Sequence, residues 1–290
     1  MKTGIKTILW SAVNNLPDKL RYLVSYSIER RRIPNLFNPR DYSEFICRDM
    51  FLNRNDKNAF LADKYLVRKY VEDKGLNSIL TKCYGVWNKA GDIDFEALPD
   101  RFALKCNHSC GMNIICNDKE KLDKLQAIEK LDLWLKTPHP MYYESHYNKI
   151  KPLILGEEFI TDHSGVFPMD YKIHCANGKP VFIQVCYDRN ENSAGKRVIL
   201  DLQWKDLHFV INKDSHYSTQ VIPKPLHLEE MLKYASILSA NLDYARVDLY
   251  DTDDRVIFGE ITLTPMGGWL DYFTQEALDL MGECIRTKLN

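Results

Sequence analysis

A stretch near the carboxyl end of the chain gives the clearest indication of secondary structure, because apolar and polar residues alternate along it. It reads Arg246-Val247-Asp248-Leu249-Tyr250, continues through a short turn, and returns as Phe258-Gly259-Glu260-Ile261-Thr262-Leu263. Such alternation predicts two half-buried antiparallel strands, since successive side chains of a strand point to opposite faces. The stretch therefore predicts a β-hairpin with one apolar face and one polar face.

Carboxylates dominate the polar face of this hairpin. If both polar sets share that face, Asp248 and Glu260 become diagonal neighbours about 7–8 Å apart. Two carboxylates that close repel each other unless a cation lies between them, and Mg²⁺ takes oxygen ligands and commonly binds phosphates as well. The pair is therefore a candidate magnesium site. The alternative is a solvent-exposed face on which Arg246 pairs with an acid.

Further antiparallel strands and several helices are predicted elsewhere. A second hairpin runs from Tyr171 to Val185 and turns at Asn177-Gly178, a strong hairpin signal. Helices mixed with antiparallel hairpins indicate an α+β fold rather than a doubly wound parallel sheet. The other expected elements are strands at 102–105, 112–116 and 153–160, helices at 56–74, 118–136, 275–288 and after Pro225, and a basic helical region over about the first 50 residues.

Two lysines in strands are candidates for binding an anion. Lys105 ends an apolar strand and precedes the small-residue loop Cys106-Asn107-His108-Ser109-Cys110-Gly111, whose backbone N–H groups could surround a phosphate. Lys172 is expected opposite Ile183 in its hairpin, where a buried lysine needs a negative partner. For each of them, a solvated basic side chain is the alternative.

Two further segments carry charge in positions that suit a nucleotide. Lys64 and Arg68 are four residues apart on a predicted helix, and an anion opposite them would relieve their repulsion. The segment Gly156-Glu157-Glu158-Phe159-Ile160 follows a buried strand, where carboxylates can accept hydrogen bonds from a ribose or an adenine amino group. The alternative is a strand end that emerges into water.

Composition limits the class of protein. The 290 residues include 39 Lys and Arg against 40 Asp and Glu, so the net charge of −1 argues against a dedicated nucleic-acid binder. No apolar run is long enough for a transmembrane helix. Eight cysteines without a secretory signal indicate reduced thiols in a cytoplasmic protein. The basic helical residues 19–32 are expected to pack on the main body, and peripheral contact with a membrane surface is left open.

The order of these motifs resembles the ATP-grasp superfamily of carboxylate ligases. It is most similar to the TupA-like ATP-grasp family, which is associated with teichuronopeptide and capsule-type polysaccharide biosynthesis. The resemblance extends from about Asn38 to the end of the chain. It is carried by Asp63-Lys64-Tyr65-x-Val67-Arg68-x-Tyr70-Val71, Asp94-Phe95-x-x-Leu98-Pro99, Phe102-x-Leu104-Lys105-Cys106-Asn107-His108 and Gly259-Glu260-Ile261-Thr262-Leu263-Thr264-Pro265.

The resemblance implies a two-lobed ATP-grasp fold that binds ATP and Mg²⁺ between its lobes. The implied division is a helical region at 1–60, a first lobe with the phosphate loop at 61–163 and a second lobe with the metal site at 164–290. Thr262 departs from the superfamily, which usually has Asn there, and the phosphate loop is poorer in glycine than in many relatives. The implied roles are ATP binding by Lys64, Lys105, His108, Gly111, Glu157, Glu158, Phe159, Ile160 and Lys172, metal binding by Asp248, Glu260 and Thr262, and catalysis by Arg246, Arg189 and Lys172.

The implied activity is an ADP-forming ligation that proceeds through an acyl phosphate. A small-molecule or glycan carboxylate, expected to be a sugar acid, would be joined to an amino acid in cell-surface polysaccharide biosynthesis. One alternative is a metal-dependent glycosyltransferase, since Asp251-Thr252-Asp253 has the D-x-D form, although turn chemistry also favours Asp there. A second alternative is a non-catalytic nucleotide-binding protein with the same fold.

Overall fold

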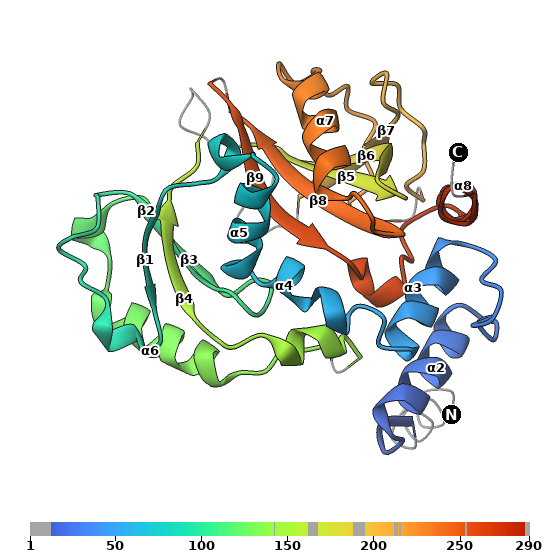
Figure 1. Ribbon diagram of the computed structural model, residues 1–290, viewed down its shortest axis with the longest axis horizontal. Helices are drawn as coiled ribbons and strands as arrows, with labels where there is room; N and C mark the ends of the chain where they lie inside the picture. The colour runs from blue at the N-terminus through green and yellow to red at the C-terminus, as the bar shows by residue number, and fades with distance from the viewer. Residues whose placement is uncertain are drawn as a thin grey trace.

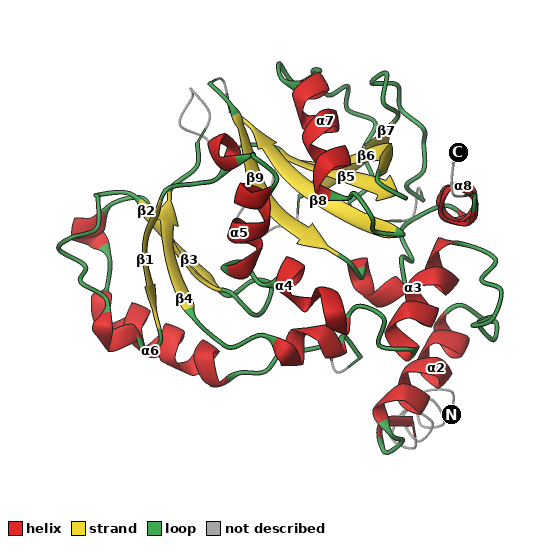
Figure 2. Ribbon diagram, viewed as in Figure 1, coloured by secondary structure: helices red, strands yellow, loops and turns green. Residues whose placement is uncertain are grey.

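The computed structural model contains two antiparallel β-sheets with helices packed around them (Figures 1 and 2). It describes residues 13–141, 143–161, 168–187, 195–211, 214, 216–252 and 254–287. Both sheets pair only neighbouring antiparallel strands. This arrangement confirms the predicted α+β class.

The first sheet has four strands in the order β1-β4-β2-β3. One of its faces is covered by α6 (Lys124–Lys136), whose Leu131 packs with Phe102 and Leu104. The opposite face carries Lys105 and Glu157, because these residues alternate with the apolar ones along their strands. The strands are β1 (Cys83–Trp87), β2 (Phe102–Cys106), β3 (Asn113–Cys116) and β4 (Ile154–Glu158).

The second sheet has five strands in the order β7-β6-β5-β8-β9. One face packs against α5 (Leu66–Asp73) and α7 (Leu228–Leu238) in an aliphatic core. Part of the other face packs against α3 (Tyr42–Phe51) and α8 (Gln275–Arg286) in an aromatic core. The strands are β5 (Asp170–Ala176), β6 (Lys179–Tyr187), β7 (Lys196–Leu200), β8 (Tyr244–Asp251) and β9 (Val256–Thr262).

Short helical turns connect these elements. They include α4 (Ala59–Ala62) and the 3₁₀ turns η1 (Asp56–Asn58), η2 (Asn77–Ile79), η3 (Ala90–Asp92), η4 (Lys119–Lys121), η5 (Ser145–Lys149) and η6 (Pro265–Gly268). The first sheet lies within residues 61–163 and the second within 164–290, but Val67 and Val71 of α5 pack into the core of the second sheet. The domain boundaries given above stay a prediction.

The helix predicted at 56–74 is interrupted at Asp63. The carboxylate of Asp63 accepts hydrogen bonds from the backbone N–H groups of Tyr65 at 2.8 Å and Leu66 at 3.2 Å, so it caps the start of α5. Lys64 therefore lies before the helix, and the prediction that it shares a helix with Arg68 is wrong. A similar cap shortens α6, because Asp123 accepts from the N–H of Gln126 at 3.0 Å.

Two β-bulges change the predicted strand registers. His174 pairs with Phe182 and Cys175 with Pro180, so Val181 is an extra residue and Lys172 lies opposite Gln184 rather than Ile183. In the last hairpin, Gly259 is the extra residue, and Asp248 lies directly opposite Glu260 rather than diagonally. A Cβ on Gly259 would lie 3.0 Å from the carbonyl oxygen of Asp248, a tight contact that favours glycine at this bulge.

The N-terminal helices hold the backbone that follows β9. Tyr22 of α2 (Asp18–Glu29) donates to the carbonyl of Gly267 at 2.6 Å, Ser43 of α3 donates to that of Gly268, and Arg30 donates to that of Trp269 at 3.4 Å. Three successive carbonyls are thus bound by side chains from the first 43 residues.

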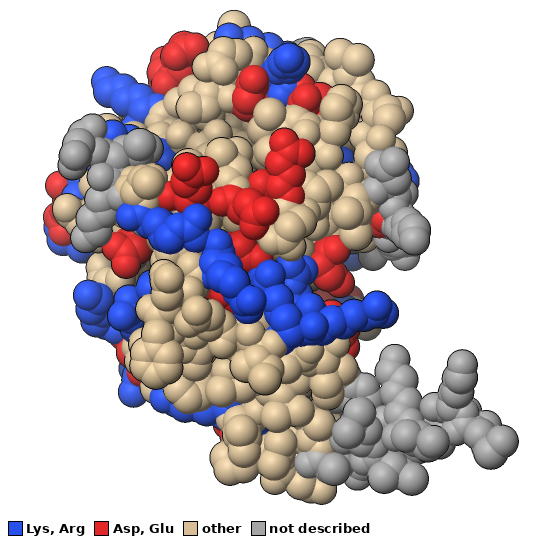
Figure 3. Space-filling view, turned by 90° about the vertical axis from the view of Figure 1, so that its right-hand side faces the viewer, with Lys and Arg blue, Asp and Glu red and all other residues tan. Residues whose placement is uncertain are grey.

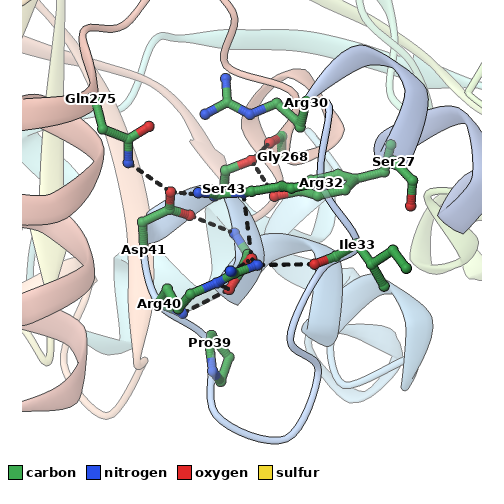
Figure 4. A network of polar contacts seen from close by, with 12 residues as sticks. Ser27, Arg30, Arg32, Ile33, Pro39, Arg40, Asp41, Ser43, Gly268 and Gln275 are labelled. Atoms are coloured by element: carbon green, nitrogen blue, oxygen red, sulfur yellow. Dashed lines mark hydrogen bonds and ion pairs between the residues drawn. The ribbon is translucent and has the colours of Figure 1, made fainter.

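A network of ion pairs fixes α3 in place (Figure 4). Asp41 is bound by Arg32 and by Gln275 of α8, and Arg40 binds Glu44. Asp41 and Glu44 are fully buried, so their arginine partners are needed to compensate the buried charge.

Figure 3 shows the face that lies at the right-hand side of Figure 1. Basic and acidic side chains form neighbouring patches on this face rather than one basic surface. The expected packing of residues 19–32 on the main body agrees with the burial of Tyr22 and Tyr26, and membrane contact stays the untested alternative.

Stability is expected to fall as the pH drops from 7 to 5. Burial lowers the pKa of His146 to about 4 and also lowers the pKa of His174. Between pH 4 and 6.5 the unfolded chain therefore binds more protons at His146 than the folded chain does, and the lowered pKa of His174 acts in the same direction. The free energy of unfolding should decrease by as much as about 1.4 kcal/mol per pH unit through His146 in this window.

Urea unfolding of the intact chain at pH 7, 6 and 5 would measure this slope. The His146→Gln variant should show a smaller slope, while His208→Asn, at an exposed position, should leave it unchanged. An identical slope in His146→Gln and the unaltered protein would contradict the assignment.

Candidate functional site

A polar cavity of about 340 Å³ lies between the two sheets. Its volume falls in the range of small-molecule sites. The first sheet and its loops contribute one wall, and the second sheet contributes the other. The residues that line it are Lys64, Arg68, Thr81, Lys105, Ser109, Cys110, Gly111, Met112, Asn113, Glu157, Ile160, Asp170, Lys172, Asp248, Tyr250, Phe258, Gly259 and Glu260.

The wall from the first lobe is cationic. Glu157 pairs with Lys105 at 3.0 Å and with Arg68 at 2.9 Å. Burial opposes ionisation of Glu157, but Lys105 and then Arg68 outweigh it, so the pKa of this carboxyl group is lowered. Lys64 lies on the same wall and has no carboxylate partner among the ion pairs of the described residues. Three cations against one carboxylate give this wall a positive charge that suits phosphates.

The loop at residues 106–111, which is predicted to bind phosphates and is called the phosphate loop below, is held in place by side chains rather than by glycines. Lys64 Nζ donates to the carbonyl of Ser109 at 2.6 Å. Asn107 is fully buried and donates to Asp63 at 2.9 Å, while its own amide oxygen accepts from the N–H of Leu153 at 2.7 Å. The side chains of two residues outside the cavity, Asp63 and Asn107, therefore set the position of the loop.

The wall from the second lobe is a ladder of alternating charges. Lys172 lies 2.7 Å from Asp170 and also binds Asp248. Arg246 donates to both oxygens of Asp248, each at 2.7 Å, and to Glu260 at 3.1 Å. Burial disfavours the charged lysine, but Asp170 and Asp248 outweigh it and raise the pKa of Lys172. Among the described residues of this wall, three carboxylates, Asp170, Asp248 and Glu260, accompany two cations, so carboxylates outnumber cations there.

This wall suits a magnesium ion. Asp248 and Glu260 are direct cross-strand partners that supply hard oxygen donors at the cavity surface. Within the described part of the chain, no three Asp, Glu, His or Cys side chains form a group that could hold a metal unaided. That agrees with how proteins usually hold Mg²⁺, through one or two carboxylates together with substrate phosphates and water. Thr262 does not line the cavity; its hydroxyl donates to Glu260 at 3.1 Å and accepts from Arg246 at 2.9 Å.

The structure brings most of the candidate residues together and separates a few. Glu158 points away from the cavity because it alternates with Glu157, and it pairs with Arg255 at 2.9 Å. Phe159 packs under the guanidinium of Arg101, and His108 bonds to the carbonyl of Thr137 at 3.1 Å, so neither lines the cavity. These three side chains thus lie outside the lining of the cavity, and their predicted roles in binding the nucleotide stay predictions.

The remaining candidate site residues differ in their position relative to the cavity. Lys64, Lys105, Gly111, Glu157, Ile160, Lys172, Asp248 and Glu260 line the cavity, Arg246 and Thr262 lie behind Asp248 and Glu260, and Arg189 lies outside the described residues. Sequence reasoning gave no role to Asp170, although its position two residues before Lys172 on a strand places it on the same face.

Among the helices of the described residues, none combines the length and the apolar character that a membrane span requires. All eight cysteines are free thiols.

The fold and the cavity define an ATP-grasp protein, and this confirms the predicted two-lobed fold. The chain belongs to the TupA-like ATP-grasp family, whose model matches residues 45–286. No curated protein sequence matches the chain.

The chain is similar to solved structures at low sequence identity. An L-amino acid ligase from Bacillus licheniformis superposes with a TM-score of 0.54 at 12% identity, covering 92% of this chain and 62% of that one. A D-alanine–D-alanine ligase from Bacillus anthracis gives a TM-score of 0.46 at 16% identity, covering 79% of this chain and 67% of that one. This chain therefore spans about two thirds of the length of these structures.

Proposed function

We propose that this protein is an ADP-forming carboxylate–amine ligase that joins an amino acid to a sugar acid. The observation that carries the proposal is the pairing of two walls across one cavity, one cationic and one rich in carboxylates. The cationic wall suits a triphosphate, and the carboxylates suit the metal ion that accompanies it. Membership of the TupA-like ATP-grasp family supports the use of ATP.

The proposed chemistry needs no protein nucleophile. A substrate carboxylate attacks the γ-phosphorus of ATP and forms an acyl phosphate while ADP leaves. The amine of the second substrate then attacks the acyl carbon, loses a proton, and expels inorganic phosphate to leave an amide. The protein contributes position and charge neutralisation, the terms that dominate phosphoryl transfer.

Each wall has a defined part in this scheme. Lys64, Arg68 and Lys105 would hold the phosphates, and Asp248 and Glu260 would hold Mg²⁺, which supplies further neutralisation of the phosphate charge when bound. Arg246 is kept rigid by Asp248 and Glu260, so its guanidinium is oriented before substrate arrives. Arg189 is proposed as the residue that binds a substrate carboxylate.

The choice of the two substrates follows from what the chain resembles. The name of the Bacillus licheniformis L-amino acid ligase, which shares the fold, is compatible with an amino acid as one substrate. A sugar acid on a glycan, in cytoplasmic steps of cell-surface polysaccharide biosynthesis, follows from the family resemblance.

The glycosyltransferase alternative is disfavoured by the surroundings of Asp251. Its carboxylate accepts from the backbone N–H of His227 at 3.2 Å and contacts the imidazole at 2.6 Å, so it is engaged in a structural contact. Asp253 lies outside the described residues.

A substrate-dependence assay tests the proposal. The purified protein, MgATP, a uronic acid and a mixture of amino acids should release ADP only when both co-substrates are present. Hydrolysis of a UDP-sugar without ATP consumption would favour the glycosyltransferase, and absence of any ATP turnover would contradict the ligase.

A further inference from the structure

Four side chains, of which only that of Ser109 belongs to a cavity-lining residue, connect the phosphate loop to the second lobe. Ser109 Oγ lies 3.1 Å from His139 Nδ1, and His139 Nε2 lies 2.7 Å from Glu144. The other oxygen of Glu144 accepts a hydrogen bond from the hydroxyl of Thr264. The chain of contacts thus runs from the loop after β2 to the residue two positions beyond β9.

His139 and Glu144, in the middle of this chain of contacts, belong to the segment between α6 and β4, which extends from the first lobe to Thr264 of the second and returns to β4. In Figure 1 this green segment runs along the lower edge of the molecule from α6 toward α3. Ser145 Oγ donates to Asp56 at 2.6 Å and anchors the segment to the turn before α4. The ring of Tyr147 stacks on His139 with centroids 3.8 Å apart and planes 9° apart, so the imidazole has a fixed orientation.

The residues that form these hydrogen bonds are largely buried, so the loss of one bond is costly. Ser109 and Thr264 are each 1% exposed, and Glu144 is 8% exposed. Water can therefore not readily replace a lost partner, and breaking one contact leaves a buried polar group unsatisfied. A carboxylate acceptor also makes the two bonds at Glu144 stronger than neutral ones.

We infer that Ser109, His139, Glu144 and Thr264 form a clasp that positions the phosphate loop against the second lobe. Ser109 lines the cavity, and its carbonyl is already held by Lys64, so the clasp fixes the same residue from its side-chain end. His139, Glu144 and Thr264 do not line the cavity and are positioning residues. The inference rests on the proposed function, since it assigns the loop to ATP phosphates.

Thr264 gives the sharpest test, because two other side chains separate it from the phosphate loop. The isosteric variants Thr264→Val and Glu144→Gln should each weaken binding of MgATP about 10-fold, measured by titration calorimetry of the intact chain. The double variant His139→Ala with Thr264→Val should be no weaker than His139→Ala alone, because the clasp acts as one unit. Ser239→Ala, which removes a buried hydroxyl bonded within its own helix, is the matched control and should bind MgATP unchanged.

Hydrogen exchange of the nucleotide-free proteins provides a second measurement. The amides of residues 106–112 should exchange faster in Thr264→Val, while those of α8 should keep their protection. MgATP binding within twofold of the unaltered protein, effects that multiply in the double variant, or unchanged exchange in the loop would each overturn the clasp.

These readouts separate the clasp from the proposed function. They need neither co-substrate, so a protein that binds MgATP but ligates nothing would overturn the ligase and still test the clasp. If the unaltered protein binds no MgATP, the proposed function fails, and the exchange measurement alone decides whether the clasp exists.

Discussion

Replacing Glu260 with glutamine should reduce ADP formation by about 100- to 1,000-fold while leaving the fold intact. The loss is of the size seen when one preorganised charge-stabilising group is removed from a reaction centre. Glu260 lies opposite Asp248 at the cavity wall and is partly exposed, so its charge can be removed without leaving a deeply buried cation unpaired. Coupled-enzyme detection of ADP, together with thermal unfolding, measures both quantities.

Two comparisons make this result interpretable. Glu129→Gln changes an exposed carboxylate on α6, outside the cavity, and should retain full activity. Asp248→Asn should lose at least as much activity as Glu260→Gln, since it alters the other carboxylate of the pair. ATP turnover that survives both Glu260→Gln and Asp248→Asn would show that the protein binds nucleotide without the proposed catalysis.

Replacing Lys172 with methionine should destabilise the protein by about 3–5 kcal/mol. The change removes the cation that lies between Asp170 and Asp248, and both carboxylates are almost completely buried. Removing one partner of a buried ion pair leaves an uncompensated charge, which costs about this much. Urea unfolding at pH 7 measures the change in the free energy of unfolding.

An exposed lysine of similar pairing serves as the control for this measurement. Lys69 pairs with Asp73 on the surface of α5, and Lys69→Met should leave the stability nearly unchanged, because an exposed ion pair contributes little. Adding Asp170→Asn to Lys172→Met should recover part of the lost stability, because one of the two buried carboxylates that contact Lys172 is then neutral. A Lys172→Met variant as stable as Lys69→Met would mean that Lys172 does not compensate the buried acids.

Much of the fold follows from alternation and turn signals. The hairpin at Asn177-Gly178 and the closing hairpin have the expected strands, because their apolar faces supply the core of the second sheet. Strand β1 was not expected, since all five of its residues are only partly buried and Gly85 interrupts the pattern. The interruption at Asp63 was also not expected, because the apolar stripe continues across it while the cap depends on local geometry.

The face to which a site side chain points could be predicted where the alternation along a strand determines it. It could be predicted less well where a β-bulge shifts the register. Glu157 and Lys105 share a face because their strands pair in simple antiparallel register. The same rule excludes Glu158 and could have been applied to the sequence once the register was assumed. The extra residues Val181 and Gly259 shift their partners by one position, and nothing in the alternation reveals such shifts.

The attachment of α2 to the loop after β9 affects how the protein can be dissected. A shortened protein limited to the family-matched residues 45–286 would lack Tyr22, Arg30 and Ser43, and the carbonyls of Gly267, Gly268 and Trp269 would lose their side-chain donors. It would also uncover the aromatic surface on which Tyr22 and Tyr26 pack. If such a fragment were inactive, the loss of these contacts would explain the inactivity, and the result would say nothing about the chemistry of the cavity. Activity should therefore be measured on protein that retains the first 44 residues.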